Sequence, residues 1–217
     1  MDLKPAQWFT FYCEYFKTIE LNVTFYKFPT AKMLSAWYNK SPKDFLFIVK
    51  APRLITHYKK FTDCTPEISD FYDACGNGLQ EKLGCLLFQF PPSFKYTEQT
   101  LDLVLNNLKP EFNNVIEFRD ISWWKQDVYE AFKANNITFC SVSHPTMPDD
   151  FIVTAPRVYI RLHGSPRLFH SSYPADYLRN LHEKLISFKT AEQAYVIFNN
   201  TAGTAGILNA QEFENLT

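Results

Sequence analysis

Residues 114–124, NVIEFRDISWW, join a run of mostly apolar side chains to a strongly polar end. The first five residues are typical of a short strand that is covered on both faces. Glu117 and Arg119 stand two residues apart where this run ends. Since side chains alternate between the two faces of a strand, both point the same way. The stretch therefore predicts a buried strand that carries a polar pair at its carboxyl end.

Six further runs have the same character, and we expect each to form a strand: 18–26, 45–52, 84–92, 137–144, 157–164 and 194–200. Helical spacing fills the segments between these runs. Residues 5–16 and 209–216 fit helices, and capping or first-turn residues predict the starts of others at Thr30, Pro66, Thr97, Ser122 and Pro174. Strand and helix alternate without a glycine-rich or charged linker, which predicts one α/β domain over residues 1–217.

The succession of seven strand and helix units favours a TIM-like (β/α) barrel over an open doubly wound sheet. A nucleotide-binding sheet would carry a G-x-G-x-x-G or Walker loop after one of its strands, and the sequence has neither.

Polar residues are dense at the carboxyl ends of the predicted strands, where barrel enzymes place their chemistry. If these side chains faced the helix layer, several unpaired ions would be buried at a high cost in free energy. We therefore expect them to point into the barrel mouth, with Trp123 or Trp124 covering its rim. The candidate set is Glu20, Asn22, Tyr26, Lys50, Arg53, Gln89, Glu117, Arg119, Arg161, His163, Asn199 and Asn200.

Cations outnumber carboxylates in this set, which predicts a small anionic ligand, either phosphorylated or carboxylated. Glu20 and Glu117 are candidate acids or bases, and Lys50 is a candidate catalytic amine that could form a Schiff base. The alternative is that each charge belongs to a structural ion pair, for example Lys50 with one of the glutamates. The same cations would repel a divalent metal, so we expect neither a metal nor another cofactor.

The whole-chain composition restricts the partners. The net charge is −1 and the isoelectric point is near 6.5, so nothing attracts nucleic acid or an anionic membrane globally. The start of the chain does not resemble a signal peptide and no apolar run is long enough to span a bilayer, which predicts a cytoplasmic protein without a membrane partner. The five cysteines include no C-x-x-C pair and are expected to be reduced. Arg53 and the basic, aromatic residues 57–60 leave nucleic-acid binding open as a less favoured alternative.

Six blocks in order, ELNVTFYKFP, FIVKAPRLITHYKKF, LGCLLFQFPPSFKY, IEFRDISWW, YIRLHG and VIFNN, resemble the signature blocks of the YecE family, a large family of unknown function. The resemblance implies a cytoplasmic TIM-like barrel, distantly similar to sugar isomerases and barrel endonucleases, and it brings no established reaction. Family members usually begin with a strand and a G-T-S-G-W type turn, and this sequence shows no such segment. The resemblance therefore implies an incomplete barrel, with seven recognisable strands where eight are expected. A gap between the first and the last strand, an open seam, would then expose two strand edges. Since exposed edges can pair with another chain, we expect a homo-oligomer formed through that seam. The remaining alternative is a non-catalytic barrel that binds a ligand or nucleic acid.

Overall fold

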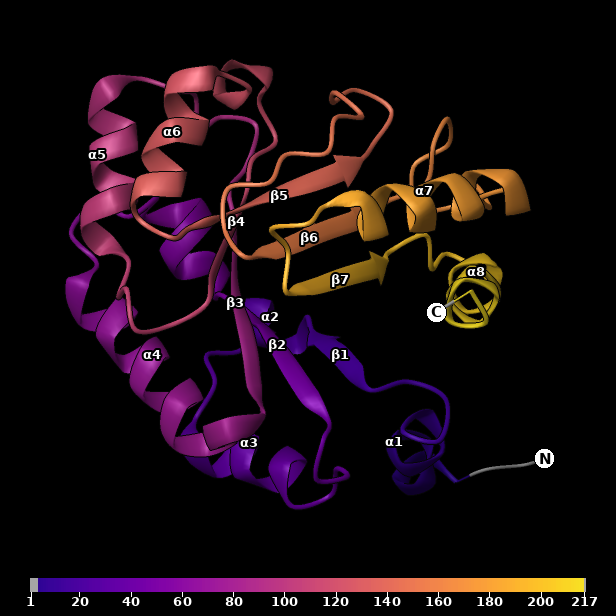
Figure 1. The fold of residues 1–217 in the computed structure, drawn as a ribbon. Coiled ribbons are helices and arrows are strands. Elements are labelled where there is room, and N and C mark those ends of the chain that lie inside the picture. The colour runs from indigo at the N-terminus through magenta and orange to yellow at the C-terminus, as the bar shows by residue number, and fades with distance from the viewer. Residues whose placement is uncertain (1–3, 217) are drawn as a thin grey trace. The chain divides into compact units, whose positions relative to one another are not determined.

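The computed structural model describes residues 4–216, which form two compact units. The first unit comprises the chain up to Phe90 together with Asp102–Asn114, and the second comprises Pro91–Leu101 and the chain from Val115 onward. Figure 1 shows strands and helices alternating along the chain in both units. That residues 1–217 form one domain stays a prediction.

Within residues 4–216 there are seven strands, at the places that the sequence predicts. Their hydrogen-bonded order follows the chain from β1 to β7, and every recorded pair is parallel. The strands are β1 (Thr18–Leu21), β2 (Leu46–Lys50), β3 (Leu83–Gln89), β4 (Asn114–Glu117), β5 (Thr138–Ser143), β6 (Arg157–Leu162) and β7 (Gln193–Phe198). The predicted α/β fold of TIM-like (β/α) barrel type is thereby confirmed.

Helices alternate with these strands. They are α1 (Pro5–Tyr12), α2 (Val23–Tyr26), α3 (Ala31–Tyr38), α4 (Thr65–Leu79), α5 (Glu98–Asn107), α6 (Gln126–Ala134), α7 (Ala175–Ser187) and α8 (Ala205–Glu214). A π-helical turn covers Leu54–Tyr58, and 3-10 turns cover Gln80–Lys82 and Ile121–Trp123. Two of the predicted capping residues act as predicted. The Thr30 hydroxyl accepts from the backbone N–H of Met33, and the Thr97 hydroxyl accepts from the backbone N–H of Thr100.

Two local predictions are wrong. The run 18–26 is a strand only as far as Leu21, because the chain then turns at Asn22 into the short helix α2. Ser122 does not begin the helix that follows β4. It lies inside a 3-10 turn whose cap is the Asp120 side chain, while α6 starts at Gln126. The Ser122 hydroxyl instead accepts a hydrogen bond from the backbone N–H of Tyr96 at 2.9 Å.

Aromatic rings fill the core of the first unit. The Phe9 ring of α1 lies 4.8 Å from Trp37 of α3 and 5.5 Å from Phe45, centroid to centroid. Farther along the chain, Phe71 of α4 packs 5.7 Å from Phe88 of β3. Edge-on ring pairs of this kind add to the free energy gained by burial, which explains why these helices hold strands β2 and β3 in place.

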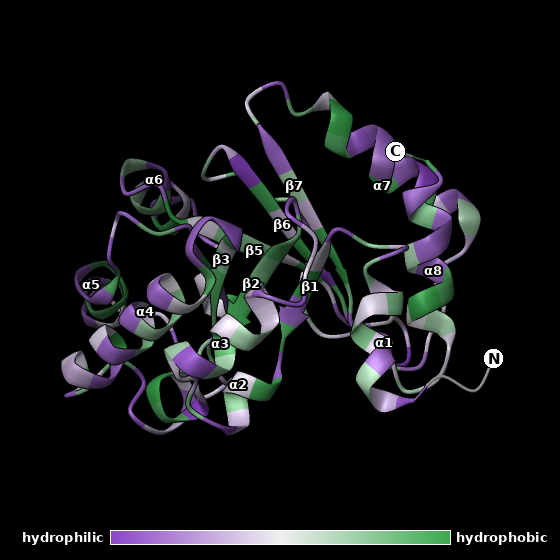
Figure 2. Ribbon diagram, turned by 90° about the horizontal axis from the view of Figure 1, so that it is seen from below, coloured by the Kyte–Doolittle hydropathy of each residue, from purple (hydrophilic) through white to green (hydrophobic). Residues whose placement is uncertain are grey.

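The second unit has an aliphatic core between its last strands and helices. Val158, Ile160 and Leu162 of β6 pack against Leu178 of α7 and Phe213 of α8. Strands β5, β6 and β7 lie side by side in Figure 1. In Figure 2, α7 carries bands of both colours, as expected for a helix with one face on this core and one in water. The core fixes the carboxyl end of β6, where Arg161 and His163 lie.

Candidate functional site

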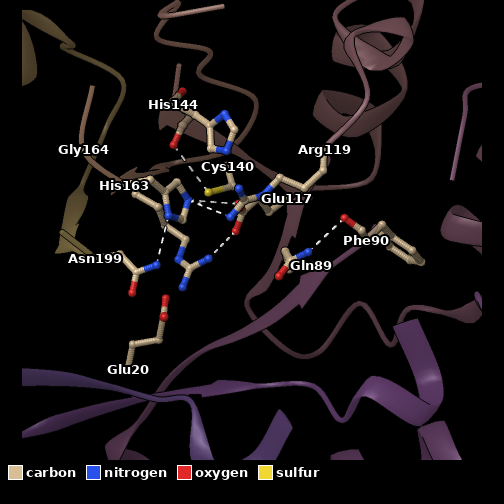
Figure 3. A network of polar contacts seen from close by, with 12 residues as sticks. Glu20, Gln89, Phe90, Glu117, Arg119, Cys140, His144, His163, Gly164 and Asn199 are labelled. Atoms are coloured by element: carbon tan, nitrogen blue, oxygen red, sulfur yellow. Dashed lines mark hydrogen bonds and ion pairs between the residues drawn. The ribbon is translucent and has the colours of Figure 1, made fainter. Parts of the chain in front are cut away.

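A buried carboxylate at the end of β4 binds two arginines in the second unit (Figure 3). Nη1 of Arg161 donates to Oε2 of Glu117 at 2.6 Å. Nε of Arg119 lies 2.6 Å from the other oxygen, Oε1, in an ion pair without hydrogen-bond geometry. The side chains of Glu117 and Arg161 are 0% and 1% exposed, whereas that of Arg119 is 14% exposed. Arg119 is thus the arginine of this pair that reaches the surface.

His163, which follows β6, joins this cluster. Its Nε2 lies 3.1 Å from Oε1 of Glu117 and 3.0 Å from Nη2 of Arg119, and its Nδ1 lies 3.0 Å from Nδ2 of Asn199. The tautomer with the proton on Nε2 donates to Glu117 and accepts from Asn199, so it satisfies two of these three contacts. In Figure 3 the dashed lines converge on the His163 ring from both sides. His163 therefore links the end of β4 to the residue after β7.

The charges of the cluster follow from burial and from its neighbours. Burial alone would raise the pKa of the Glu117 carboxyl, but Arg119 and Arg161 outweigh it and hold that pKa well below its ordinary value. Burial lowers the pKa of His163 to about 4, in spite of Glu117, which acts to raise it. At neutral pH the cluster therefore contains an ionised carboxylate, two guanidinium groups and a neutral imidazole.

His144, at the end of β5, also lies in this region, although the sequence analysis gives it no site role. Its ring centroid is 5.8 Å from that of His163, and its Nδ1 accepts from the backbone N–H of Thr146 at 3.2 Å. The neutral ring then carries its proton on Nε2. Burial, and then Arg119, lower the pKa of His144. A histidine one residue past a strand end, on a strand between β4 and β6, is the signal that could have identified it.

In the first unit, the predicted residues lie at the ends of β1, β2 and β3. Nδ2 of Asn22 donates to Oε1 of Glu20 at 2.9 Å, as expected for residues on one face. Nζ of Lys50 lies 4.4 Å from the centre of the Phe25 ring. At the end of β3, Nε2 of Gln89 donates to the backbone oxygen of the next residue, Phe90, at 3.0 Å.

Arg53 and Tyr26 form a second group in the first unit, together with Tyr58 from the π-helical turn. The guanidinium carbon of Arg53 lies 5.9 Å from the ring centre of Tyr26 and 5.4 Å from that of Tyr58. These tyrosines are 72% and 64% exposed. Tyr26 is therefore a surface residue of α2 and not the end of a strand, as the sequence suggested.

Trp123 does not cover a rim, which corrects the prediction from the sequence. It is completely buried, its ring stacks on Phe118 at 3.8 Å, and its indole N–H donates to the backbone oxygen of Phe94 at 2.7 Å. With its polar atom and its ring face both occupied inside the second unit, Trp123 has nothing to offer a ligand. Its role is structural.

Asn200 joins two other segments of the second unit, and its ligand-binding role stays a prediction. It is fully buried, and its Nδ2 donates to the backbone oxygen of Ser171 and to Oδ1 of Asn209. Asn209 of α8 in turn accepts from the backbone N–H of Tyr173 at 2.9 Å and donates to the backbone oxygen of the same residue at 2.8 Å. The two asparagines thus tie helix α8 to the segment after β6.

Within residues 4–216, no group of three or more His, Cys, Asp or Glu side chains is placed to hold a metal ion. None of the five cysteines, all of which lie in the described part of the chain, forms a disulfide. None of the helices described has both the length and the apolar character that a membrane span requires.

Parallel strands in chain order, alternating helices and polar residues at the strand ends define an α/β protein of TIM-like barrel type. The family described as "Protein of unknown function DUF72" matches residues 1–217, and the chain belongs to this family. The predicted resemblance to the YecE family is confirmed, because YecE is among the curated relatives that match.

Two curated relatives illustrate the relationship. The chain is 26% identical over 171 residues to the UPF0759 protein YunF of Bacillus subtilis (strain 168), a match that covers 70% of this chain and 60% of YunF. It is 28% identical over 109 residues to the UPF0759 protein YecE of Escherichia coli (strain K12), covering 50% of this chain and 40% of YecE. The matches thus span less than two thirds of the length of either relative.

Solved structures support the fold. A DUF72 family protein from Thermotoga maritima MSB8 matches with a TM-score of 0.88 and 27% identity, over 99% of this chain and 90% of that one. A DUF72 family protein from Enterococcus faecalis V583 matches with a TM-score of 0.84 and 22% identity, over 97% of this chain and 93% of that one. The second likeness concerns the fold alone.

Proposed function

We propose that the cluster around Glu117 is a binding site for a small anionic, sugar-like molecule. The observation that carries this proposal is that Arg119 is both paired with a buried carboxylate and partly exposed to solvent. Its guanidinium is anchored on one edge by a buried carboxylate at 2.6 Å, yet its side chain keeps 14% of its surface exposed. A partly buried guanidinium whose orientation is fixed binds carboxylate or phosphate groups strongly, because its N–H donors already point in the direction needed for bidentate hydrogen bonds.

In this proposal Glu117 is a positioning residue and not an acid or base. Both of its oxygens are in contact with cations or with His163, and its side chain is fully buried. A carboxylate whose pKa is held far below its ordinary value is a poor proton acceptor near neutral pH. The carboxylate instead fixes the direction in which Arg119 points.

Two neutral groups of the same region suit hydroxyl groups on the ligand. The pKa of His144 is lowered by burial and by Arg119, and both His144 and Asn199 are half-buried, whereas the fully buried His163 contacts Asn199 and Arg119 from the interior. Neutral imidazole and amide groups both donate and accept hydrogen bonds, which a sugar hydroxyl requires. The combination of one accessible cation with two neutral polar groups supports a phosphorylated or carboxylated polyol. Ligand contacts by Asn22, Gln89 and Arg53, and catalysis by Glu20 or Lys50, stay predictions.

Thermal unfolding and calorimetric titration with sulfate, inorganic phosphate and a panel of sugar phosphates test the proposal. We expect at least one of these anions to raise the melting temperature of the parent chain. Arg119→Ala should weaken that binding about tenfold or more, since it removes a charge-assisted contact. Arg179→Ala is the matched control, because Arg179 lies on α7 with its side chain 55% exposed and pairs with Asp176. Equal losses in the two variants, or no effect of any anion on the parent, would sink the proposal.

A second candidate function concerns Arg53, Tyr26 and Tyr58. Two exposed tyrosine rings lie near one guanidinium. Proteins bind single-stranded nucleic acids with such groups, because aromatic rings stack on bases and cations pair with phosphates. Fluorescence anisotropy of a labelled oligonucleotide over a salt series tests it. Binding that weakens steeply with salt and is lost in Tyr58→Ala favours this candidate, and absence of binding at low salt excludes it.

A further inference from the structure

The segment that follows β6 holds a phenylalanine in an unusual backbone conformation. Phe169 has a φ of 63°, in the left-handed region that residues with bulky side chains seldom adopt. Strained residues of this kind persist only where the surrounding structure imposes them, and they cluster at binding sites. The conformation of Phe169 therefore requires an explanation.

Hydrogen bonds on both sides of Phe169 impose the conformation. Its backbone N–H donates to the oxygen of His163 at 2.6 Å, and its own oxygen accepts from the backbone N–H of Ala202 at 3.1 Å. The turn that leads to it is equally tight. Gly164 has a φ of 88°, and a Cβ at that position would lie 3.1 Å from the oxygen of Arg167 and 3.3 Å from the nitrogen of Phe169. The backbone thus folds directly back onto the end of β6.

This arrangement leaves an apolar ring beside the polar cluster. The Phe169 ring centroid lies 6.3 Å from that of His163, with the two rings at 79°, and Phe169 remains 42% exposed. Single exposed apolar residues are common on protein surfaces and need no explanation by themselves. Here, however, a strained backbone holds the exposed ring against the histidine that also contacts Arg119.

We infer that Phe169 is a specificity-determining residue that packs against an apolar ring face of the ligand. This inference rests on the proposed function, and it narrows the ligand to an anionic group joined to a ring. The anionic group binds Arg119, and the C–H face of a sugar ring, or an aromatic ring, packs on Phe169. Since Arg119 and Phe169 both contact the His163 ring, one small molecule can reach both residues.

The experiment compares two phosphate monoesters that differ by a ring. Methyl phosphate carries the anion alone, and phenyl phosphate adds a ring with two apolar faces. Calorimetric titration of the full chain should give about three- to tenfold tighter binding for phenyl phosphate, the range expected for one well-placed aromatic contact. Glucose 6-phosphate, compared with glycerol 3-phosphate, repeats the test with a sugar ring.

Phe169→Asn removes the ring and keeps a residue that tolerates the left-handed conformation, so the loop should still fold. We expect this variant to bind methyl phosphate as the parent does and to lose the preference for the ring-bearing esters. Phe169→Tyr keeps the ring and should keep the preference. An unchanged melting temperature without ligand shows that Phe169→Asn is folded.

The outcomes separate this inference from the proposed function. If methyl phosphate binds in an Arg119-dependent way but the parent shows no preference for a ring, the inference is overturned and the anion site stands. A preference that survives in Phe169→Asn overturns the inference in the same way. If no phosphate ester binds the parent at millimolar concentration, the proposed function is overturned and the inference with it.

Discussion

The carboxylate of Glu117 and the guanidinium of Arg161 meet at 2.6 Å with both side chains withdrawn from water. Removing two such charges from water costs several kcal/mol per ion, and only close, well-directed pairing offsets that cost. Removing either charge of this pair should therefore strongly lower the free energy of unfolding of the second unit.

Glu117→Gln keeps the shape of the side chain and removes its charge. We expect it to lower the free energy of unfolding by about 3–5 kcal/mol, because two guanidinium groups are left beside a neutral amide. Urea denaturation measures the change. Asp176→Asn is the control, since it breaks an exposed pair with Arg179 and should change stability by about 1 kcal/mol or less. Similar effects of the two substitutions would contradict the account of a buried, charge-dependent cluster.

Stability should fall in mild acid because of His163. Its pKa drops from the ordinary value of 6.5 to about 4 in the folded chain, so between these values the unfolded state binds a proton that the folded state does not. Stability is complete above pH 6.5 and decreases as the pH falls through this window, by roughly 3 kcal/mol for a shift of this size. Glu117, whose pKa is lowered, adds a further loss below pH 4.5.

Urea unfolding at intervals from pH 7.5 to pH 4.5 measures this dependence. His163→Gln removes the titrating group, and the slope above pH 4.5 should flatten while the overall stability drops. A parent chain whose stability does not change from pH 6.5 to pH 4.5 would show that His163 is not neutral in the fold.

His144 should make anion binding depend on pH. Burial and the neighbouring Arg119 lower its pKa from the ordinary value of 6.5, so the ring is neutral at pH 7 and gains a positive charge only at a pH below 6.5. We expect the affinity for sulfate to rise as the pH is lowered below 6.5, since the charge of sulfate itself does not change there. His144→Gln should abolish the rise. Sulfate affinity that is flat with pH in the parent would exclude His144 from the site.

Two glycines of α4 should respond oppositely to alanine. A Cβ at Gly78 would lie 2.6 Å from Cβ of Leu34 and 2.9 Å from the oxygen of Ala31, both on α3, so Gly78→Ala forces the helices apart. We expect a loss of about 1–3 kcal/mol. A Cβ at Gly76 meets only the Phe112 ring at 3.4 Å, and Gly76→Ala should stabilise by up to about 1 kcal/mol through helix propensity. Denaturant midpoints of both variants check the contrast.

Periodicity accounts for what the sequence predicts correctly. Apolar runs such as that of β4 require burial on both faces, and their alternation with helical spacing leaves few topologies, so the seven strands and the fold class are predictable. Strict alternation also places Glu117 with Arg119, and Arg161 with His163, on common faces. Only β5 separates β4 from β6 in the parallel order of strands, and the two pairs are in contact at the strand ends.

What the sequence does not reveal depends on partners far along the chain. Trp123 is buried because the backbone oxygen of Phe94, 29 residues earlier, accepts from its indole. The amide nitrogen of Asn200 is held by Asn209 and by the backbone oxygen of Ser171, 29 residues earlier. No local pattern indicates the left-handed backbone of Phe169 either, since it results from bonds to His163 and Ala202. Association of copies through an open seam stays a prediction, which light scattering on the purified chain can test.

Asn209 gives the last helix a role beyond covering the core. The Asn209 side chain accepts from the backbone N–H of Tyr173 and donates to its backbone oxygen. The Tyr173 hydroxyl in turn accepts from the backbone N–H of Gly164 at 2.8 Å. Two side chains, those of Asn209 and Tyr173, thus connect α8 to the turn at Gly164 that precedes Phe169. Ending the chain at Ala205, or replacing Asn209 by leucine, should make residues 164–169 more mobile although neither change touches them. Hydrogen exchange at the backbone N–H of Phe169 should then become faster.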